Sequence, residues 1–372
     1  MSMKPSMLVA LGLFGSLIAG CSHTLPPHQE VNQALQKTLG ATGYNYSSKS
    51  RITNLVVPVK EIKAAASKQD YLEKGIEIAR GISVAADGAI DLKTRKSEVL
   101  YNLLYNQDNL DVSVKVPLLL DYTTQTLYVG TTFLNSIFPL PPGSKGKMIK
   151  VDFNEVFKES QGKTDRFKDV FGKKNFDSMQ EGLKKGVLKG FADLKDERFA
   201  DQPLTGDDKN AGVVRRVSMH LNHEESVTLF LTIADALIQR LYQDAVLSKE
   251  EYGTFMILTD RQKMDTYLAK FSMSVVLDIG LDAAGRISRM ETRMAATDKD
   301  KQFQLGIENV SSFNRYDTPV FSMKPELTGT VDYKEILNAY LAAKAAAKAE
   351  AAAAKNKLPK QDEPKEEKKV TE

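Results

Sequence analysis

Two histidines and two glutamates lie close together in the segment His220-Leu-Asn-His223-Glu224-Glu225. These are residue types from which proteins build zinc sites. On a strand His220 and His223 would point to opposite faces, whereas on a helix their side chains could converge. The glutamates also have a simpler role, because acidic residues directly before a helix stabilise its positive dipole end. We expect this simpler role, and therefore neither a metal site nor a bound cofactor.

Little else in the chain could carry catalysis. The sequence has one cysteine and four histidines, and it contains no glycine-rich phosphate loop and no nucleophile elbow. Scattered Asp and Glu residues are typical of solvated faces. We expect a protein that is not an enzyme, and a hydrolase with an unrecognised site is the weakest alternative.

The single cysteine, Cys21, follows a segment typical of an exported protein. Lys4 supplies a positive charge, the stretch 7–18 is apolar, and the small residues Ala19 and Gly20 come directly before the cysteine. The apolar run is roughly a dozen residues long, against about twenty for a membrane-spanning helix, so we expect no permanent span. A cysteine thiolate is the nucleophile that can accept a diacylglyceryl group.

Ile18-Ala19-Gly20-Cys21 resembles the lipobox of bacterial lipoproteins. The resemblance implies that residues 1–20 are a signal peptide and that a lipidated Cys21 becomes the amino terminus, with a membrane as its partner. Two or more acyl chains would hold the protein on a bilayer almost permanently. Ser22 stands where a lipoprotein retained at the inner membrane often has Asp, which favours the periplasmic face of the outer membrane in a cell with two membranes. An ordinary secretory signal with a coincidental cysteine is the alternative.

The composition is that of an ordinary globular chain of 372 residues, with 42% hydrophobic and 27% charged residues. A net charge of +3 leaves no electrostatic footprint for nucleic acid. With its only cysteine committed to lipid, the body depends on its core for stability. After the signal peptide we expect a tether over 21–29, a folded body over 30–332, and over 333–372 an Ala/Lys-rich helical arm that runs into a disordered tail.

Alternating apolar and polar residues predict an antiparallel sheet. The segment 111–121 is the clearest strand, and Pro117 within it places this strand at an edge or a bulge because proline lacks a ladder donor. The segment 271–281 alternates in the same way and turns through 282–285 into 286–294. Further strands are expected over 44–57, 126–130, 213–222 and 302–313, the last of them closing the sheet.

Apolar residues at helical spacing predict helices over 30–39, 175–194 and 226–245. Ser248 with Glu251 predicts a capping box that opens a further helix. Gly182, Gly186 and Gly190 recur four residues apart. This spacing resembles a transmembrane dimer seam, but neighbouring lysines exclude a span, so we expect the glycines to pack closely against another backbone.

The patterns over 111–130 and 270–294, with the helices between them, resemble the half-barrel of LolA/LolB-type and LppX-type lipoprotein carriers. The fold class expected is therefore α+β, with a curved, half-barrel-like antiparallel sheet packed on amphipathic helices. The resemblance implies an apolar cleft for acyl chains, with the candidate lining residues Val112, Val114, Val116, Leu118, Met273, Val275 and Leu277. A closed core beneath the helices is the alternative, because alternation is the same in both.

Three prolines make 136–143 a predicted loop that carries Phe138 and Leu140. In LolB-like proteins an exposed apolar loop helps to deliver lipid to the membrane, so Phe138 and Leu140 are candidates for membrane contact. A buried loop cap is the alternative.

Taken together, these features predict a non-catalytic envelope lipoprotein that binds a lipid or another apolar ligand in a cleft between sheet and helices. The alternative function is that of a structural or assembly lipoprotein. In that alternative, the arm beyond Leu341 docks another envelope protein.

Overall fold

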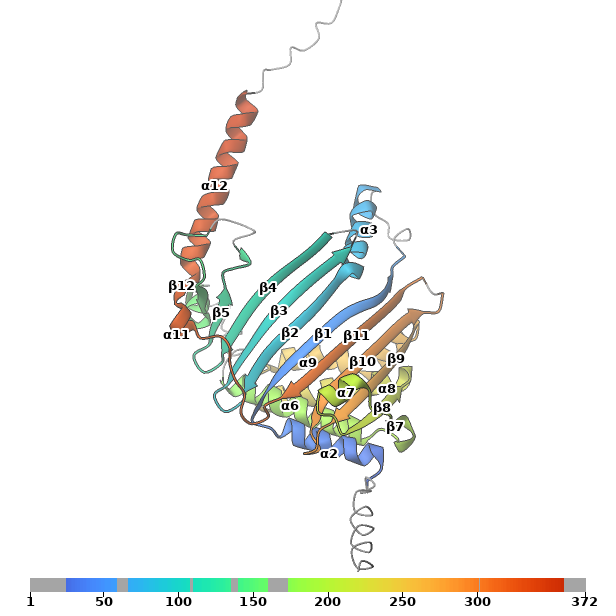
Figure 1. The fold of residues 1–372 in the computed structure, drawn as a ribbon. Coiled ribbons are helices and arrows are strands. Elements are labelled where there is room, and N and C mark those ends of the chain that lie inside the picture. Colours follow the sequence, from blue (N-terminus) through green and yellow to red (C-terminus); the bar gives the residue numbers. More distant parts are fainter. Residues whose placement is uncertain are drawn as a thin grey trace, which may run out of the picture.

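A computed structural model describes residues 25–58, 66–107, 110–134, 140–159, 173–300 and 302–357. These residues form a mixed α+β fold around one large sheet (Figure 1). Its strand order is β12-β6-β5-β4-β3-β2-β1-β11-β10-β9-β8-β7, and every pair is antiparallel except β12 with β6. The outer strands β12 and β7 do not pair with each other in the described chain, so the sheet is open.

The strands are β1 (Gly43–Val56), β2 (Ile82–Asp91), β3 (Lys96–Gln107), β4 (Leu110–Asp121), β5 (Thr126–Gly130), β6 (Met148–Asp152), β7 (Phe199–Gln202), β8 (Arg215–Leu221), β9 (Phe271–Leu281), β10 (Ile287–Asp298), β11 (Gln304–Asn314) and β12 (Thr330–Asp332). The helices are α2 (Pro27–Leu39), α3 (Ala66–Gly81), α4 (Phe153–Glu159), α6 (Lys173–Ala192), α7 (Gly206–Asn210), α8 (His223–Gln243), α9 (Lys249–Thr259), α10 (Arg261–Leu268), α11 (Pro325–Thr328) and α12 (Tyr333–Lys357).

Local signals placed most of these elements correctly. The turn between β9 and β10 is held by Asp282, whose Oδ1 accepts hydrogen bonds from the backbone N–H groups of Ala284 and Arg286. Gly285 in this turn has φ 71°, which glycine adopts without strain. The predicted capping box of Ser248 and Glu251 is present at the start of α9 and is confirmed.

One boundary and one position differ from the expectation. Helix α2 begins at Pro27 rather than at Glu30, because proline is favoured in the first turn of a helix. The prediction that 302–313 closes the sheet is wrong, since β11 lies in the middle, between β1 and β10. The chain returns after β10 to pair with its own first strand, and local alternation carries no information about that choice of neighbour.

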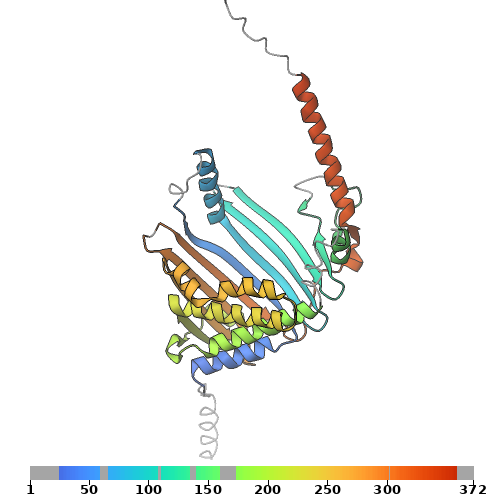
Figure 2. The same cartoon turned by 180° about the vertical axis from the view of Figure 1, so that it is seen from behind.

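One layer of helices covers one face of half of the sheet. Figure 2 shows α2, α6 and α8 lying across strands β11 to β8, whereas on the other half α3 contacts β1 and β3 at one end of the sheet. Side chains from both layers make the main core, including Val31, Phe191, Val217, Met219, Ile279 and Leu281.

The glycines of α6 lie against α8. At Gly186 a β-carbon would be 2.8 Å from Ile233 Cα and 2.9 Å from the Ile233 carbonyl oxygen, and at Gly182 it would be 3.0 Å from Leu237 Cα. The helices can approach this closely only because the side chains are missing. The prediction of close backbone packing is confirmed.

Helix α12 starts from a small second core formed by Ile149, Val331 and Ile336. It then leaves the body as the long helix at the upper left of Figure 1. Among the described residues, no helix is both long and apolar enough to cross a membrane.

Candidate functional site

The sheet has one apolar face and one polar face. Strand register connects the mainly apolar face across eight strands, along a row made of Val116, Tyr101, Ala86, Ser48, Ser311, Met290, Ile279 and Val217. All seven candidate lining residues, Val112, Val114, Val116, Leu118, Met273, Val275 and Leu277, lie on this apolar face, because they share the alternation of this row. The helix layer and these seven side chains are therefore on the same side of the sheet.

The helices divide the candidate residues into two groups. Val275 and Leu277 on β9 are half-buried and pack against the main core under α2, α6 and α8. Met273, nearer the end of β9, is half-buried. On this half of the sheet Val275 and Leu277 belong to a filled core, whereas Met273 lines a hollow of about 490 Å³ together with Met294 and Ile307.

The candidate residues on β4 are Val112, Val114, Val116 and Leu118. They lie on the half of the sheet that α2, α6 and α8 do not cover. Val112 is 41% exposed, and its neighbours Tyr101 and Leu103 on β3 are 38% and 40% exposed. Leu110 at the start of β4 is 56% exposed. We define the open apolar patch as Tyr101, Leu103, Leu110, Val112, Val114 and Val116, which share the apolar face of β3 and β4.

The opposite face of the same two strands is mixed, because Leu100, Leu104 and Pro117 lie there beside polar side chains. There Asn102, Ser113 and Lys115 alternate with the patch residues, and Ser113 Oγ donates a hydrogen bond to Asn102 Oδ1 over 2.7 Å. Apolar exposure is thus concentrated on one side of β3 and β4. A contiguous exposed apolar surface in a soluble body commonly marks an interaction site.

A group of uncharged polar side chains separates the open apolar patch from the main core. Asn309 Nδ2 lies 2.8 Å from both Ser48 Oγ and Ser50 Oγ, and Ser311 Oγ lies 2.8 Å from Asn309 Oδ1. We call these four residues the serine–asparagine cluster. It interrupts an otherwise apolar surface at β1 and β11.

Other predicted positions are divided between described and undescribed parts of the chain. Cys21 and Phe138 lie outside the described residues. Leu140 is half-buried and packs against the second core, next to Ile149 and Val331. For Leu140 this packing agrees with the alternative of a buried loop cap and not with a side chain exposed for membrane contact.

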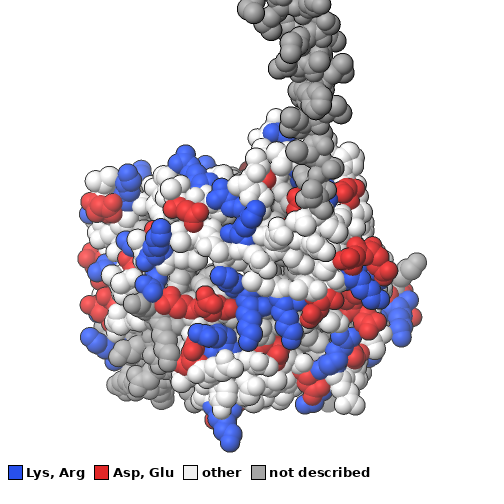
Figure 3. Space-filling view, turned by 90° about the horizontal axis from the view of Figure 1, so that it is seen from below, with Lys and Arg blue, Asp and Glu red and all other residues white. Residues whose placement is uncertain are grey.

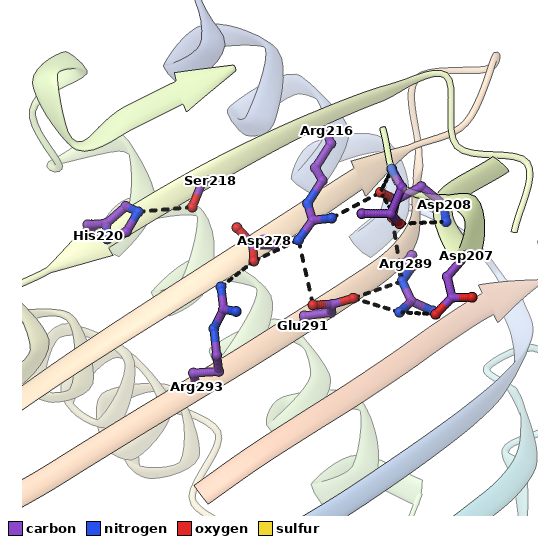
Figure 4. Close-up of polar contacts among 10 residues, drawn as sticks. Asp207, Asp208, Arg216, Ser218, His220, Asp278, Arg289, Glu291 and Arg293 are labelled. Atoms are coloured by element: carbon purple, nitrogen blue, oxygen red, sulfur yellow. Dashed lines mark hydrogen bonds and ion pairs between the residues drawn. The ribbon is translucent and has the colours of Figure 1, made fainter. Parts of the chain in front are cut away.

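The polar face carries an ion-pair network that connects α7 to β8, β9 and β10 (Figure 4). Asp278 Oδ2 lies 2.9 Å from Arg216 Nη2 and 2.5 Å from Arg293 Nη2. Arg216 also reaches Asp208 Oδ2 at 3.1 Å, and Arg289 reaches Glu291 Oε1 at 2.6 Å. The network is a chain of alternating charges.

Its two buried carboxylates remain ionised at neutral pH. Burial alone would raise the pKa of Asp278, but hydrogen bonds from Ser218 and Arg216 and the charges of Arg216 and Arg293 outweigh it and lower the pKa below 3.8. Burial also acts to raise the pKa of Asp208, and Thr205 and Arg216 together lower it. Neither group could serve as a general acid near pH 7, and we interpret the network as structural.

The histidine segment is divided between a strand and a helix. The imidazole of His220 on β8 lies beside Ser218, with Nε2 at 3.1 Å from Ser218 Oγ. His223 is instead the first residue of α8. Glu225 forms a capping box with Asn222 and pairs with Arg198 at 2.6 Å. In the described part of the chain no three His, Cys, Asp or Glu side chains are grouped so that they could hold a metal ion.

A hollow of about 670 Å³ on the polar face lies beside the segment 321–330. It is lined by charges of both signs, among them Lys96, Lys150, Lys324, Asp121 and Glu326. Figure 3, which views the molecule from below, likewise shows acidic and basic residues mixed over the surface. This surface has no large region of a single charge that would select an ion or a nucleic acid.

In comparisons with known protein families and with curated proteins, nothing matches this chain.

Proposed function

We propose that this protein is a non-catalytic envelope lipoprotein that binds the acyl chain of a lipid on its open apolar patch. The observation that carries the proposal is the exposure of Tyr101, Leu103 and Val112 on the apolar face of the sheet, at 38%, 40% and 41%. Covering apolar surface contributes about 25 cal/mol per Å², so a surface of this kind stabilises any complex that hides it from water. In this proposal the sheet acts as the half-barrel of LolA/LolB-type and LppX-type carriers, and the patch takes the role of their apolar cleft.

The lipid anchor supports the same function. With Cys21 lipidated, only residues 22–26 would separate the anchor from α2, which begins at Pro27. Five extended residues span at most about 18 Å. The body would therefore stay close to a bilayer, from which an acyl chain could be taken, and we propose the periplasmic face of the outer membrane as its location.

A binding titration tests the proposal. The purified full-length protein is titrated with a fluorescent long-chain acyl methyl ester whose emission rises in apolar surroundings. Leu103→Ser should raise the Kd of this probe about tenfold, because the side chain that it removes lies in the patch. Asn102→Ser on the opposite face is the matched control and should leave the Kd unchanged. No saturable binding to the wild-type protein, or equal effects of the two substitutions, would refute acyl binding at the patch.

A second function is supported by helix α12. Leu337 and Leu341 lie four residues apart on this helix and are 47% and 51% exposed. Residues at this spacing share a helix face, so α12 could dock another envelope protein as an amphipathic helix in a groove. Cross-linking in cells should then lose a protein partner when both leucines are replaced by serine, and an unchanged set of partners would exclude this function.

A further inference from the structure

We propose that the ligand of the open apolar patch is an uncharged ester or amide of a long acyl chain, with its carbonyl held by the serine–asparagine cluster. The inference rests on the proposed function and specifies the class of lipid. It is carried by the hydrogen bonding of the cluster, its lack of charge, and its distance from β4.

The hydrogen bonds of the cluster leave hydroxyl hydrogens available to a ligand. Asn309 Nδ2 gives its two hydrogens to Ser48 and Ser50. Ser311 Oγ is the donor both to Asn309 Oδ1 at 2.8 Å and to Ser48 Oγ at 3.2 Å, so its single hydrogen serves one of the two at a time. Ser48 and Ser50 accept within the cluster, and among the described residues neither hydroxyl has an acceptor for its own hydrogen. A ligand oxygen that accepts the hydrogen of Ser50 would give that hydroxyl a partner.

The sheet around the cluster carries no charge on the apolar face. Across the strands its neighbours are Val84 and Ala86 on β2 and Met290 and Thr292 on β10. A phosphate or carboxylate placed here would lose its hydration without gaining a counter-charge from these strands, which is costly. A neutral carbonyl loses much less hydration free energy than a charged group when it is buried. The cluster therefore selects an ester or an amide.

The distance from the cluster to the edge of the patch suits one acyl chain. Register places Ser50 opposite Val84, Val84 opposite Leu103, and Leu103 opposite Val114. Three strand spacings separate Ser50 from Val114, which is about 14 Å. One leaflet of a bilayer core is about 15 Å thick, so an acyl chain has the reach to run from the cluster across β2 and β3 to β4.

The test is a competition experiment on the purified full-length protein. Monooleoylglycerol, which has an uncharged ester head, and oleoyl lysophosphatidic acid, which has the same chain and a phosphate, are each tested for displacement of the fluorescent acyl ester probe. Monooleoylglycerol should compete at least tenfold better. Ser50→Ala should weaken the competition by monooleoylglycerol about three- to tenfold, which corresponds to the loss of one hydrogen bond. The same substitution should change the competition by oleoyl lysophosphatidic acid by less than about twofold.

Ser47→Ala is the matched control, because Ser47 precedes the cluster on β1 and faces the polar side of the sheet. It should leave both competitors unchanged. Equal competition by the two lipids, or an equal effect of Ser50→Ala on both, would overturn the head-group inference while acyl binding at the patch stands. A probe that does not bind, or that binds equally to Leu103→Ser, would remove the proposed function and the inference with it.

Discussion

The ring of Pro117 occupies the position where a β-carbon of Gly130 would lie, since Cγ of the proline is only 2.2 Å from that position. Strand β5 pairs with β4 only from Leu118 to Asp121 and ends at this contact. Proline has no N–H to offer a neighbouring strand. In the described chain the outer side of β4 from Leu110 to Pro117 therefore has no partner strand, and the open apolar patch lies along this edge.

Gly130→Ala should destabilise the protein. The added methyl group would overlap the ring of Pro117, and overpacking of this kind costs about 1–3 kcal/mol. The free energy of unfolding, measured by urea denaturation, should fall by this amount. The double variant Gly130→Ala with Pro117→Ala should recover part of the loss, and a loss that remains complete would show that the ring is not its cause.

Gly186→Ala should also destabilise, although alanine is the better helix former by up to about 1 kcal/mol. The new β-carbon would lie within 3 Å of backbone atoms of Ile233, which cannot move aside without shifting α8. Gly75→Ala on α3 is the matched control, because a β-carbon there meets no atom within 4 Å. Denaturation curves should show a loss of stability for Gly186→Ala and a small gain of stability for Gly75→Ala. Gains of stability for both variants would contradict the close packing of α6 against α8.

Asp278 should make stability depend on acid pH. Its pKa in the folded protein is lowered below 3.8, so the folded state holds the carboxylate ionised at pH values where the unfolded chain takes up a proton. Stability from this group is present above pH 3.8 and is lost as the pH falls through 3.8 toward the lowered pKa. The loss approaches about 1.4 kcal/mol per pH unit in that window.

Asp278→Asn should remove the contribution of this carboxyl to the loss of stability in acid. It should also lower the free energy of unfolding at pH 7 by about 3 kcal/mol, because Arg216 loses a buried partner. Asp207→Asn at the rim of the network, where the side chain is 76% exposed, is the control and should follow the wild type. Unfolding followed by circular dichroism between pH 2 and pH 7 measures both. An unchanged slope in Asp278→Asn would show that the ion pairs do not produce the acid sensitivity.

The proposed anchor predicts that cells fed an alkyne analogue of palmitate label the wild-type chain. Cys21→Ser should lose all of the label, because a hydroxyl does not replace the thiolate as nucleophile. The mature wild-type protein should begin at Cys21. Label retained in Cys21→Ser, or a mature amino terminus elsewhere, would rule out lipidation at this residue.

Local patterns in the sequence were sufficient for most elements of the fold. The alternation over 271–281, the glycine spacing in α6 and the capping box at Ser248 each depend on neighbours within a few residues, and each prediction was correct. The helices α3, α4, α7 and α11 and the short strands β6, β7 and β12 were not predicted. Short strands of three to five residues carry too little alternation to be recognised.

The site was less accessible to sequence reasoning. Val112 and Val275 show the same alternation, yet one is exposed and the other packs against the core, because the helix layer covers only part of the sheet. The serine–asparagine cluster was missed because Ser48 and Asn309 are 261 residues apart and meet only through the pairing of β1 with β11. Polar residues within the apolar alternation of 44–57 and 302–313 were the available signal.

Residue-level photolabelling would locate an acyl chain on the open apolar patch. A long-chain acyl methyl ester that carries a diazirine is bound to the purified full-length protein and irradiated, and its adducts are located by mass spectrometry. We expect adducts on Tyr101, Leu103 and Val112, which excess monooleoylglycerol suppresses. Adducts confined to other exposed apolar residues, such as Phe230 on α8, which is 60% exposed, or no adducts at all, would contradict acyl binding at the patch.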